Sequence, residues 1–304
     1  MKKGFITIAT GDERYYHMAR TLLRSYRQTC EKPLRFAIIA DRENEYTKEF
    51  DDVVLLPAPT FSWMDKIALL QNCPYDETIF IDADCLVYQN INFLWSLFEN
   101  ADDFSCFGNV LPMDSKEGWF TSEVEELYPI HFITHLHGML YFIRKGDGID
   151  QMAKWCQNLI AEYHKVSYKA FNTVLADEPV FALAMAIMNY KPIERRPEYY
   201  CFVPFATKLS VNYHKKKVSY SNPKDGNVDQ CCIIHWGNKN TQKAQYRTEM
   251  KTVDDVHASR QRQSLYYRMI YISYYIQGKM HAAKDFISWF VGRIHLKIQR
   301  VGKQ

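Results

Sequence analysis

The stretch TIFIDADCLVY, residues 78–88, constrains the fold more than any other part of the chain. Its first four residues are apolar or β-branched and predict a strand buried on both faces, as in a parallel sheet. Asp82 and Asp84 follow at once, and side chains two residues apart on an extended backbone point to the same side. Because ligands bind beyond the carboxyl ends of such strands, we expect the two carboxylates at the mouth of a site.

Other segments predict the rest of an α/β sheet that is mostly parallel. Short apolar runs predict strands, and runs with apolar residues at helical spacing predict helices between them. The expected strands are 5–10, 34–41, 52–59, 78–81, 102–110 and 137–145, with one more running into a loop within 230–240. The expected helices are 17–29, 65–73, 150–164 and 177–190.

The composition is that of a globular chain. Of its 304 residues, 47% are apolar and 24% charged, which fits a sizeable core and excludes wholesale disorder. No apolar run approaches the roughly 18 residues that cross a bilayer, and the opening residues predict a strand, not a signal peptide. The eight cysteines form no C-x-x-C pair. A zinc ribbon is therefore not expected, and we expect reduced thiols in the cytoplasm.

Two carboxylates on one side of a strand end can converge on one cation. Oxygen ligands of this kind suit Mg²⁺ or Mn²⁺, and phosphate oxygens of a bound ligand can complete the coordination shell. The plainer alternative is a pair of surface acids, Asp82 and Asp84, that close a turn.

Three other functions remain open at this point. A haloacid-dehalogenase-like phosphatase also has two aspartates after a strand, but it has Thr or Val where this chain has Leu86. A sugar nucleotidyltransferase would have a glycine-rich loop after the first strand, and ATGDERYY at 9–16 is poor in glycine. The third is a nucleotide-sugar binding protein without catalytic activity.

The segment YDETIFIDADCLV, 75–87, resembles the DxD segment of GT-A fold glycosyltransferases, especially the retaining group of glycogenin and the lipopolysaccharide galactosyltransferases. Other stretches resemble that group in the same order along 4–242. They are TIATGDERYYHMARTLLRSYRQT at 7–29, FSWMDKIALLQNCPYDE at 61–77, HGMLYFIR at 137–144, ADEPVFALAM at 176–185 and IIHWGNKN at 233–240. The resemblance implies a GT-A α/β fold and metal-dependent transfer of a sugar from a nucleotide diphosphate sugar, expected to be a UDP-sugar, to a glycan or glycolipid.

The resemblance also implies roles for individual residues. The implied ligands of Mn²⁺ or Mg²⁺ are Asp82, Asp84 and His235. The implied donor-binding residues are Thr10, Gly11 and Tyr15 at the base and ribose, Asp82 also at the ribose, Lys66 and Lys239 at the phosphates, and Gly138 at the sugar. Asp177 and Glu178 are implied at the sugar or acceptor. A retaining reaction, which we expect, needs no strong base, whereas in an inverting one Asp177 or Glu178 would deprotonate the acceptor hydroxyl.

The C-terminal part differs in charge from the rest. We expect a catalytic domain at 1–250 and a basic, aromatic helical tail at 251–304. Within 260–304 there are nine Lys and Arg residues and one acid, a charge of +8, against +3 for the whole chain. Such a tail fits an anionic membrane surface, so we expect a peripheral position on the cytoplasmic face of a membrane. Packing on the catalytic domain or dimerisation are the alternatives, and a nucleic acid partner is not expected because no binding motif accompanies the tail.

Overall fold

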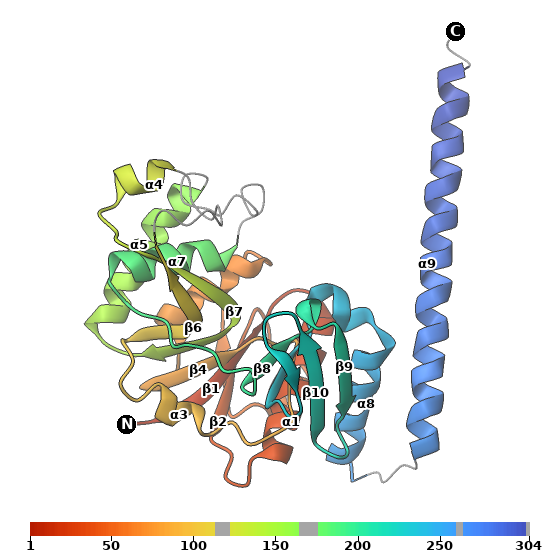
Figure 1. Cartoon of the computed structure of the whole chain (residues 1–304), viewed down its shortest axis with the longest axis horizontal. Coiled ribbons are helices and arrows are strands. Elements are labelled where there is room, and N and C mark those ends of the chain that lie inside the picture. The colour runs from red at the N-terminus through yellow and green to blue at the C-terminus, as the bar shows by residue number, and fades with distance from the viewer. Residues whose placement is uncertain (113–121, 164–175, 260–263, 302–304) are drawn as a thin grey trace.

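The computed structural model describes residues 1–112, 122–163, 176–259 and 264–301 (Figure 1). A six-stranded sheet has the order β3-β2-β1-β4-β7-β6. Its strands are β1 (Lys3–Ala9), β2 (Arg35–Ala40), β3 (Asp52–Leu55), β4 (Glu77–Ile81), β6 (Phe104–Leu111) and β7 (Ile133–Arg144). Strands β3, β2, β1 and β4 are parallel, and β7 runs antiparallel to both β4 and β6. The predicted α/β fold with a mostly parallel sheet is confirmed.

Helices cover both faces of this sheet, which explains its almost uninterrupted apolar strands. Successive residues point to opposite faces, so Phe5 packs in the cluster under α1 (Glu13–Thr29) while Ile6 packs in the cluster on the other face. That second cluster includes residues of α2 (Leu69–Asn72), α5 (Asp147–Ala161) and α7 (Asp177–Ile187).

Two small sheets complete the body. One has the order β5-β12-β8 and consists of β5 (Cys85–Val87), β12 (Ile233–His235) and β8 (Tyr200–Phe202). The other contains β9 (Lys208–Asn212), β10 (Lys217–Asn222) and β11 (Gly226–Val228). In the first, β12 pairs antiparallel with β5, and His235 lies opposite Cys85. This pairing brings His235 next to Asp82 and Asp84, which precede it by 153 and 151 residues in the sequence.

The helix expected at 65–73 consists of two short helices, a 3₁₀ helix followed by an α-helix. It begins as the 3₁₀ helix η2 (Trp63–Ala68), with the Ser62 side chain as its N-cap, and ends in α2 before Pro74. The strand expected at 137–145 begins earlier, at Ile133, because its N-terminal half pairs with β6. The helix expected at 150–164 is α5, shifted by three residues.

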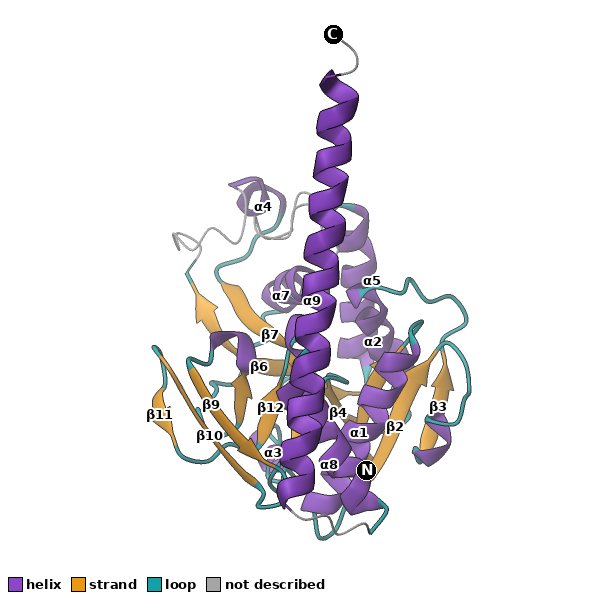
Figure 2. Ribbon diagram, turned by 90° about the vertical axis from the view of Figure 1, so that its right-hand side faces the viewer, coloured by secondary structure: helices purple, strands orange, loops and turns teal. Residues whose placement is uncertain are grey.

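The C-terminal elements are two helices, α8 (Ala244–His257) and α9 (Ser264–Val301). Helix α8 lies against α1, where Arg24 donates to Asp254 at 2.7 Å, so the position 250 expected as a domain boundary falls inside a helix of the body. Helix α9 starts beside α8 and extends well beyond the other elements (Figure 2). In the part of the chain that the structure describes, no helix is both long and apolar enough to cross a membrane. The remaining short helices are η1 (Thr47–Glu49), α3 (Leu94–Leu97), α4 (Ser122–Leu127), η4 (Val203–Phe205) and η5 (Asn238–Gln242).

Candidate metal and nucleotide-sugar site

A cavity of about 1220 Å³ opens at the carboxyl ends of β1 and β4, where an open α/β sheet binds ligands. Most of the predicted site residues line it: Thr10, Tyr15, Lys66, Asp82, Asp84, Gly138, Asp177, Glu178 and His235. Gly11 and Lys239 are not among the lining residues. Lys239 is exposed on η5, so its predicted contact with phosphate has no support from its position.

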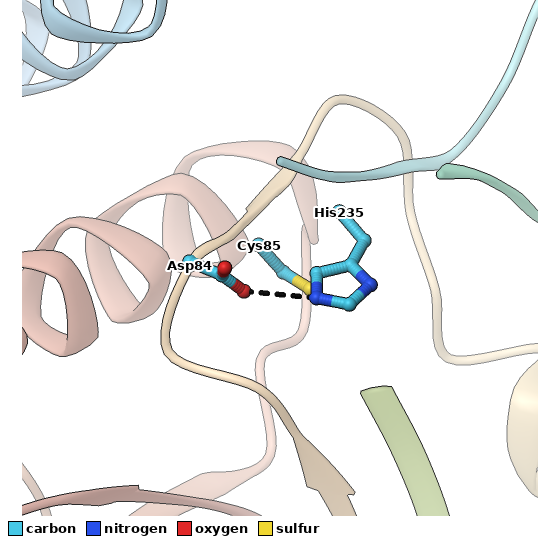
Figure 3. Close-up of side chains that lie close together, drawn as sticks. All are labelled: Asp84, Cys85 and His235. Carbon is cyan, nitrogen blue, oxygen red and sulfur yellow. Dashed lines mark ion pairs between the residues drawn. The ribbon is translucent and has the colours of Figure 1, made fainter. Parts of the chain in front are cut away.

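The centre of the cavity holds Asp82, Asp84 and His235. His235 Nε2 lies 3.1 Å from Asp84 Oδ1 and 4.0 Å from Asp82 Oδ2 (Figure 3 shows the first pair). The ring of His235 is fixed by stacking on Phe202, with the centroids 4.8 Å apart. Burial alone would lower the pKa of His235, but the nearby carboxylates of Asp84 and Asp82 raise it above its ordinary value.

These three residues fit a divalent cation. Asp84 Oδ1 is buried and faces Nε2 of His235 at 3.1 Å, so two potential ligand atoms are directed at one place. Two ligands about 2.1 Å from one ion lie about 3.0 Å apart when adjacent and about 4.2 Å apart when opposite. The separation of 3.1 Å between Asp84 and His235 is close to the first value, and the Asp82 oxygen that lies 4.0 Å from His235 would join them after a shift of its side chain. Oxygen and imidazole ligands could therefore hold one ion here.

Cys85 is the third residue of a group with Asp84 and His235 whose ligand atoms lie within 4.8 Å of one another, the one such group among the described residues. Its thiol is completely buried, and burial together with the neighbouring aspartates raises its pKa well above the ordinary value. A protonated thiol is a weak ligand, so the donor set that remains consists of carboxylates and imidazole. Such a set suits a hard or borderline cation rather than a soft one.

Lys66 is buried and held by the acidic centre. Its Nζ donates to Asp82 Oδ2 at 2.9 Å and to the carbonyl of Gly138 at 2.8 Å, and it lies 3.7 Å from Asp177 Oδ2. Burial would lower its pKa, but Asp177 and Asp82 raise it, so the ammonium stays charged. The neighbouring Asp65 is not a partner of Lys66 and instead accepts hydrogen bonds from Thr10 and Thr60.

Asp177 and Glu178 begin α7 and differ in what they contact. Asp177 is buried and accepts a hydrogen bond from the Tyr141 hydroxyl at 2.6 Å, so it orients Lys66 and Tyr141. Glu178 accepts from the backbone N–H of Gly138 at 2.6 Å. Burial and the charge of Asp177 raise the pKa of Glu178 to about 7. Of the two, Glu178 is better suited to exchange a proton near neutral pH.

The end of the cavity beyond His235 is aromatic. His137 lies 5.9 Å from Phe202 and 6.4 Å from Phe205 between ring centroids, and Phe205 is largely exposed. Burial and the neighbouring histidines lower the pKa of His137 to about 4, so its imidazole is neutral. Arg195 is paired with Asp225 at 2.7 Å, which leaves this end with little net charge.

The end of the cavity at β1 contains Thr10 and Tyr15. The Thr10 hydroxyl donates to Asp65 Oδ2 at 2.7 Å, and Gly11, with φ +78°, donates its N–H to Asp41. The Tyr15 hydroxyl accepts from Arg14 at 2.8 Å. Of the residues predicted for the base and ribose, Thr10 and Tyr15 therefore line the same cavity as the acidic centre, because β1 and β4 are neighbours, whereas Gly11 does not line it.

The sequence did not reveal several cavity residues. Phe61 and Trp63 follow a proline-containing segment without periodicity, and nothing in the pattern distinguishes them from loop aromatics. Tyr141 lies within an apolar strand and there resembles a core residue. Phe202 and Phe205 lie in a stretch whose short strand was not predicted. For Tyr141 a signal exists, since a buried tyrosine hydroxyl requires a hydrogen-bond partner.

No protein-family model matches the sequence, and no curated protein sequence matches it either. Among solved structures, the galactosyltransferase LgtC with donor and acceptor sugar analogues is similar at a TM-score of 0.47 and 11% identity, covering 88% of this chain and 99% of that one. Mouse xyloside xylosyltransferase 1 is similar at a TM-score of 0.45 and 11% identity, covering 79% and 99%. The glycosyltransferase GlyE of Streptococcus pneumoniae is similar at a TM-score of 0.43 and 13% identity, and the match covers 64% of this chain and 46% of that one. All three are glycosyltransferases, the class that the sequence resembles.

Proposed function

We propose that this protein is a metal-dependent glycosyltransferase that moves a sugar from a nucleotide diphosphate sugar to a glycan or glycolipid. The observation that carries the proposal is the convergence of Asp82 and Asp84, in the turn between β4 and β5, with His235 of β12. Two neighbouring carboxylates in one buried site are costly unless positive charge offsets them, and a bound cation would supply such charge.

The proposed cation is Mn²⁺ or Mg²⁺, and the proposed donor is a UDP-sugar. A divalent cation bound here supplies Lewis-acid stabilisation of the negative charge on a leaving diphosphate. Lys66 adds a fixed positive charge next to Asp82. Because Lys66 is already paired, its part is to orient Asp82 and limit the charge of the site, not to bind phosphate alone.

Glu178 is the residue that we assign to the transferred sugar or the acceptor. Its contact with the N–H of Gly138 fixes the carboxyl group where the backbone of β7 reaches the cavity. In a retaining reaction, which we favour, the carboxylate would hold a sugar hydroxyl and steady positive charge at the reacting carbon. In an inverting reaction the same group would take the proton of the acceptor hydroxyl.

A panel of UDP, GDP and CMP sugars, each with and without Mn²⁺, tests the proposal by thermal shift and by release of the nucleotide. A ligand at 100 times its Kd stabilises the folded chain by about 2.7 kcal/mol. We expect a shift with one nucleotide that requires both Mn²⁺ and Asp84, and that is lost in Asp84→Asn. The matched control is Asp229→Asn, which changes an exposed carboxylate outside the cavity. No shift with any nucleotide, or release of inorganic phosphate from phosphate esters instead, would reject the proposal in favour of the phosphatase.

We also propose that α9 places the enzyme on the cytoplasmic face of an anionic membrane. Leu265, Met269, Ile272, Ile276 and Met280 are spaced by three or four residues, share one face of the helix, and are each more than half exposed. The net charge of +8 over 260–304 matches a surface that carries anionic lipid. The free cysteines fit a reducing compartment.

Sedimentation with vesicles tests the membrane proposal. We expect the protein to bind vesicles with about 30% anionic lipid, to bind neutral vesicles less, and to lose binding when Ile272 and Ile276 are replaced by glutamate. The control is Leu55→Glu, an exposed apolar residue on β3. Unchanged sedimentation of the double variant, or a dimer that the double variant disrupts, would contradict the proposal.

A further inference from the structure

Phe61 has a backbone conformation that bulky residues rarely adopt. Its φ is +54°, in the left-handed region where an L-residue's Cβ crowds the backbone and where Gly and Asn are favoured. Its side chain is 63% exposed, so packing in the core does not explain the conformation. The ring lines the cavity at the β1 end. Strained residues of this kind occur disproportionately where a ligand binds.

Hydrogen bonds on both sides hold this conformation. Thr60 donates its N–H to Asp65 Oδ1 at 2.6 Å, and its hydroxyl donates to the same oxygen at 2.7 Å. On the other side, Ser62 accepts from the N–H of Met64 and caps η2. Asp65 Oδ2 accepts from the hydroxyl of Thr10. The loop is therefore fixed to the end of β1, and the ring of Phe61 is directed into the cavity by a rigid frame.

The surroundings of the ring suit a flat ligand. A Cβ atom at Gly11 would lie 3.0 Å from a ring carbon of Phe61, so the ring rests against the Gly11 backbone. Trp63, 46% exposed, also lines the cavity. On the same helix η2, Lys66 contacts Asp82. One short segment thus carries aromatic side chains at one part of the cavity and an ammonium group at the proposed metal site.

We propose that Phe61, with Trp63, is the platform on which the base of the nucleotide stacks. This inference rests on the proposed function, since it needs a nucleotide in the cavity. Aromatic side chains stack on any base because every base has a π-face. The two rings therefore add affinity for the nucleotide without selecting its base. The strained backbone of Phe61 keeps its ring exposed in the cavity, where a base can stack on it.

Calorimetric titration of the full chain with UDP and with GDP, each in EDTA and in Mn²⁺, tests the platform. The variant is Phe61→Asn, because Asn accepts the left-handed conformation but has no ring to stack. We expect its affinity for the bound nucleotide to fall by about 5- to 100-fold, by the same factor in EDTA and in Mn²⁺. Its melting temperature should equal or exceed that of the wild type. Phe61→Tyr should restore the affinity, and Asp84→Asn should remove only the gain from Mn²⁺.

The outcomes separate the two proposals. Nucleotide binding that is equal in Phe61→Asn and the wild type overturns the platform and leaves the transferase proposal standing. A loss that appears only with Mn²⁺, or that Phe61→Tyr does not restore, also overturns the platform, because stacking does not depend on the metal. If the wild type binds no nucleotide under either condition, the proposed function and the platform both fail.

Discussion

Replacing Lys66 with methionine tests the electrostatic account of the cavity. The ammonium lies 2.9 Å from Asp82 Oδ2 and 3.7 Å from Asp177 Oδ2. At an effective dielectric constant of about 20, these separations correspond to about 6 and about 4 kcal/mol of attraction. The variant no longer has to bury an ammonium group, and this saving offsets several kcal/mol of the loss. The expected net loss in the free energy of unfolding is about 3–5 kcal/mol, typical when one partner of a buried pair is removed.

Urea unfolding measures this loss, and Mn²⁺ gives the experiment a second readout. Without Lys66 the cavity is more negative, so we expect Mn²⁺ to bind the variant more tightly and to recover part of the lost stability. The control is Lys154→Met, on the exposed side of α5, which should change stability by less than about 0.5 kcal/mol. Two results would refute the reasoning. One is a loss of less than about 1 kcal/mol in the free energy of unfolding of Lys66→Met, and the other is an affinity of this variant for Mn²⁺ no higher than that of the wild type.

Three further predictions concern other residues. Burial raises the pKa of Glu249 to about 7, above its ordinary value of 4.5, so its contribution to stability is fully present below about pH 4.5 and is lost as the pH rises to 7. In the wild type this titration should lower the free energy of unfolding by about 3 kcal/mol between pH 5 and 7. Glu249→Gln keeps a hydrogen-bond partner for Tyr88 and should remove this decrease. The same pH dependence of the free energy of unfolding in variant and wild type would contradict the prediction. Glu178→Gln removes the carboxylate charge that either reaction needs, so it should lower kcat by about 10²- to 10⁴-fold and remove an apparent pKa near 7 from the pH–rate profile. An unchanged profile would show that the ionisation of Glu178 does not control the reaction. Gly138→Ala places a Cβ 2.9 Å from Tyr141 Oη and 3.0 Å from Glu178 Oε1, so activity should fall at least tenfold with a loss of about 1–3 kcal/mol in stability; wild-type activity would show that the cavity adjusts.

Much of the fold could be predicted because local pattern and sheet position agree. The apolar runs before Ala9, Ala40 and Ile81 are the parallel strands that the pattern indicates, and the carboxylates after β4 lie where such strands place a ligand. Lys66 was predicted to lie in the site, but its partners were not. The contact of Lys66 with Asp82 depends on the course of the chain between η2 and β4, which no sequence period specifies.

Other site residues could not be predicted from the pattern, because their positions depend on contacts between segments that are distant in the sequence or on the conformation of a loop. His235 could be assigned to the site only through the resemblance, since its approach to Asp84 depends on β12 joining β5. Phe61 could not be assigned at all, because its importance lies in a φ angle that hydrogen bonds to Asp65 impose. A pattern of residue types predicts which face a side chain occupies, but not the conformation of an irregular loop.

The charge of the cavity connects this fold to its proposed chemistry. Asp82, Asp84, Asp177 and Glu178 line one cavity together with the positive groups Lys66 and His235. Apolar residues at these positions would make the fold more stable, because the attraction within a buried ion pair seldom exceeds the free energy lost when its charges leave water. Burial and the charge of Asp177 raise the pKa of Glu178, which indicates that the acids of the cavity outweigh its two positive groups. A divalent cation would supply further positive charge, and the excess of acid that destabilises the fold on its own would then bind the ion.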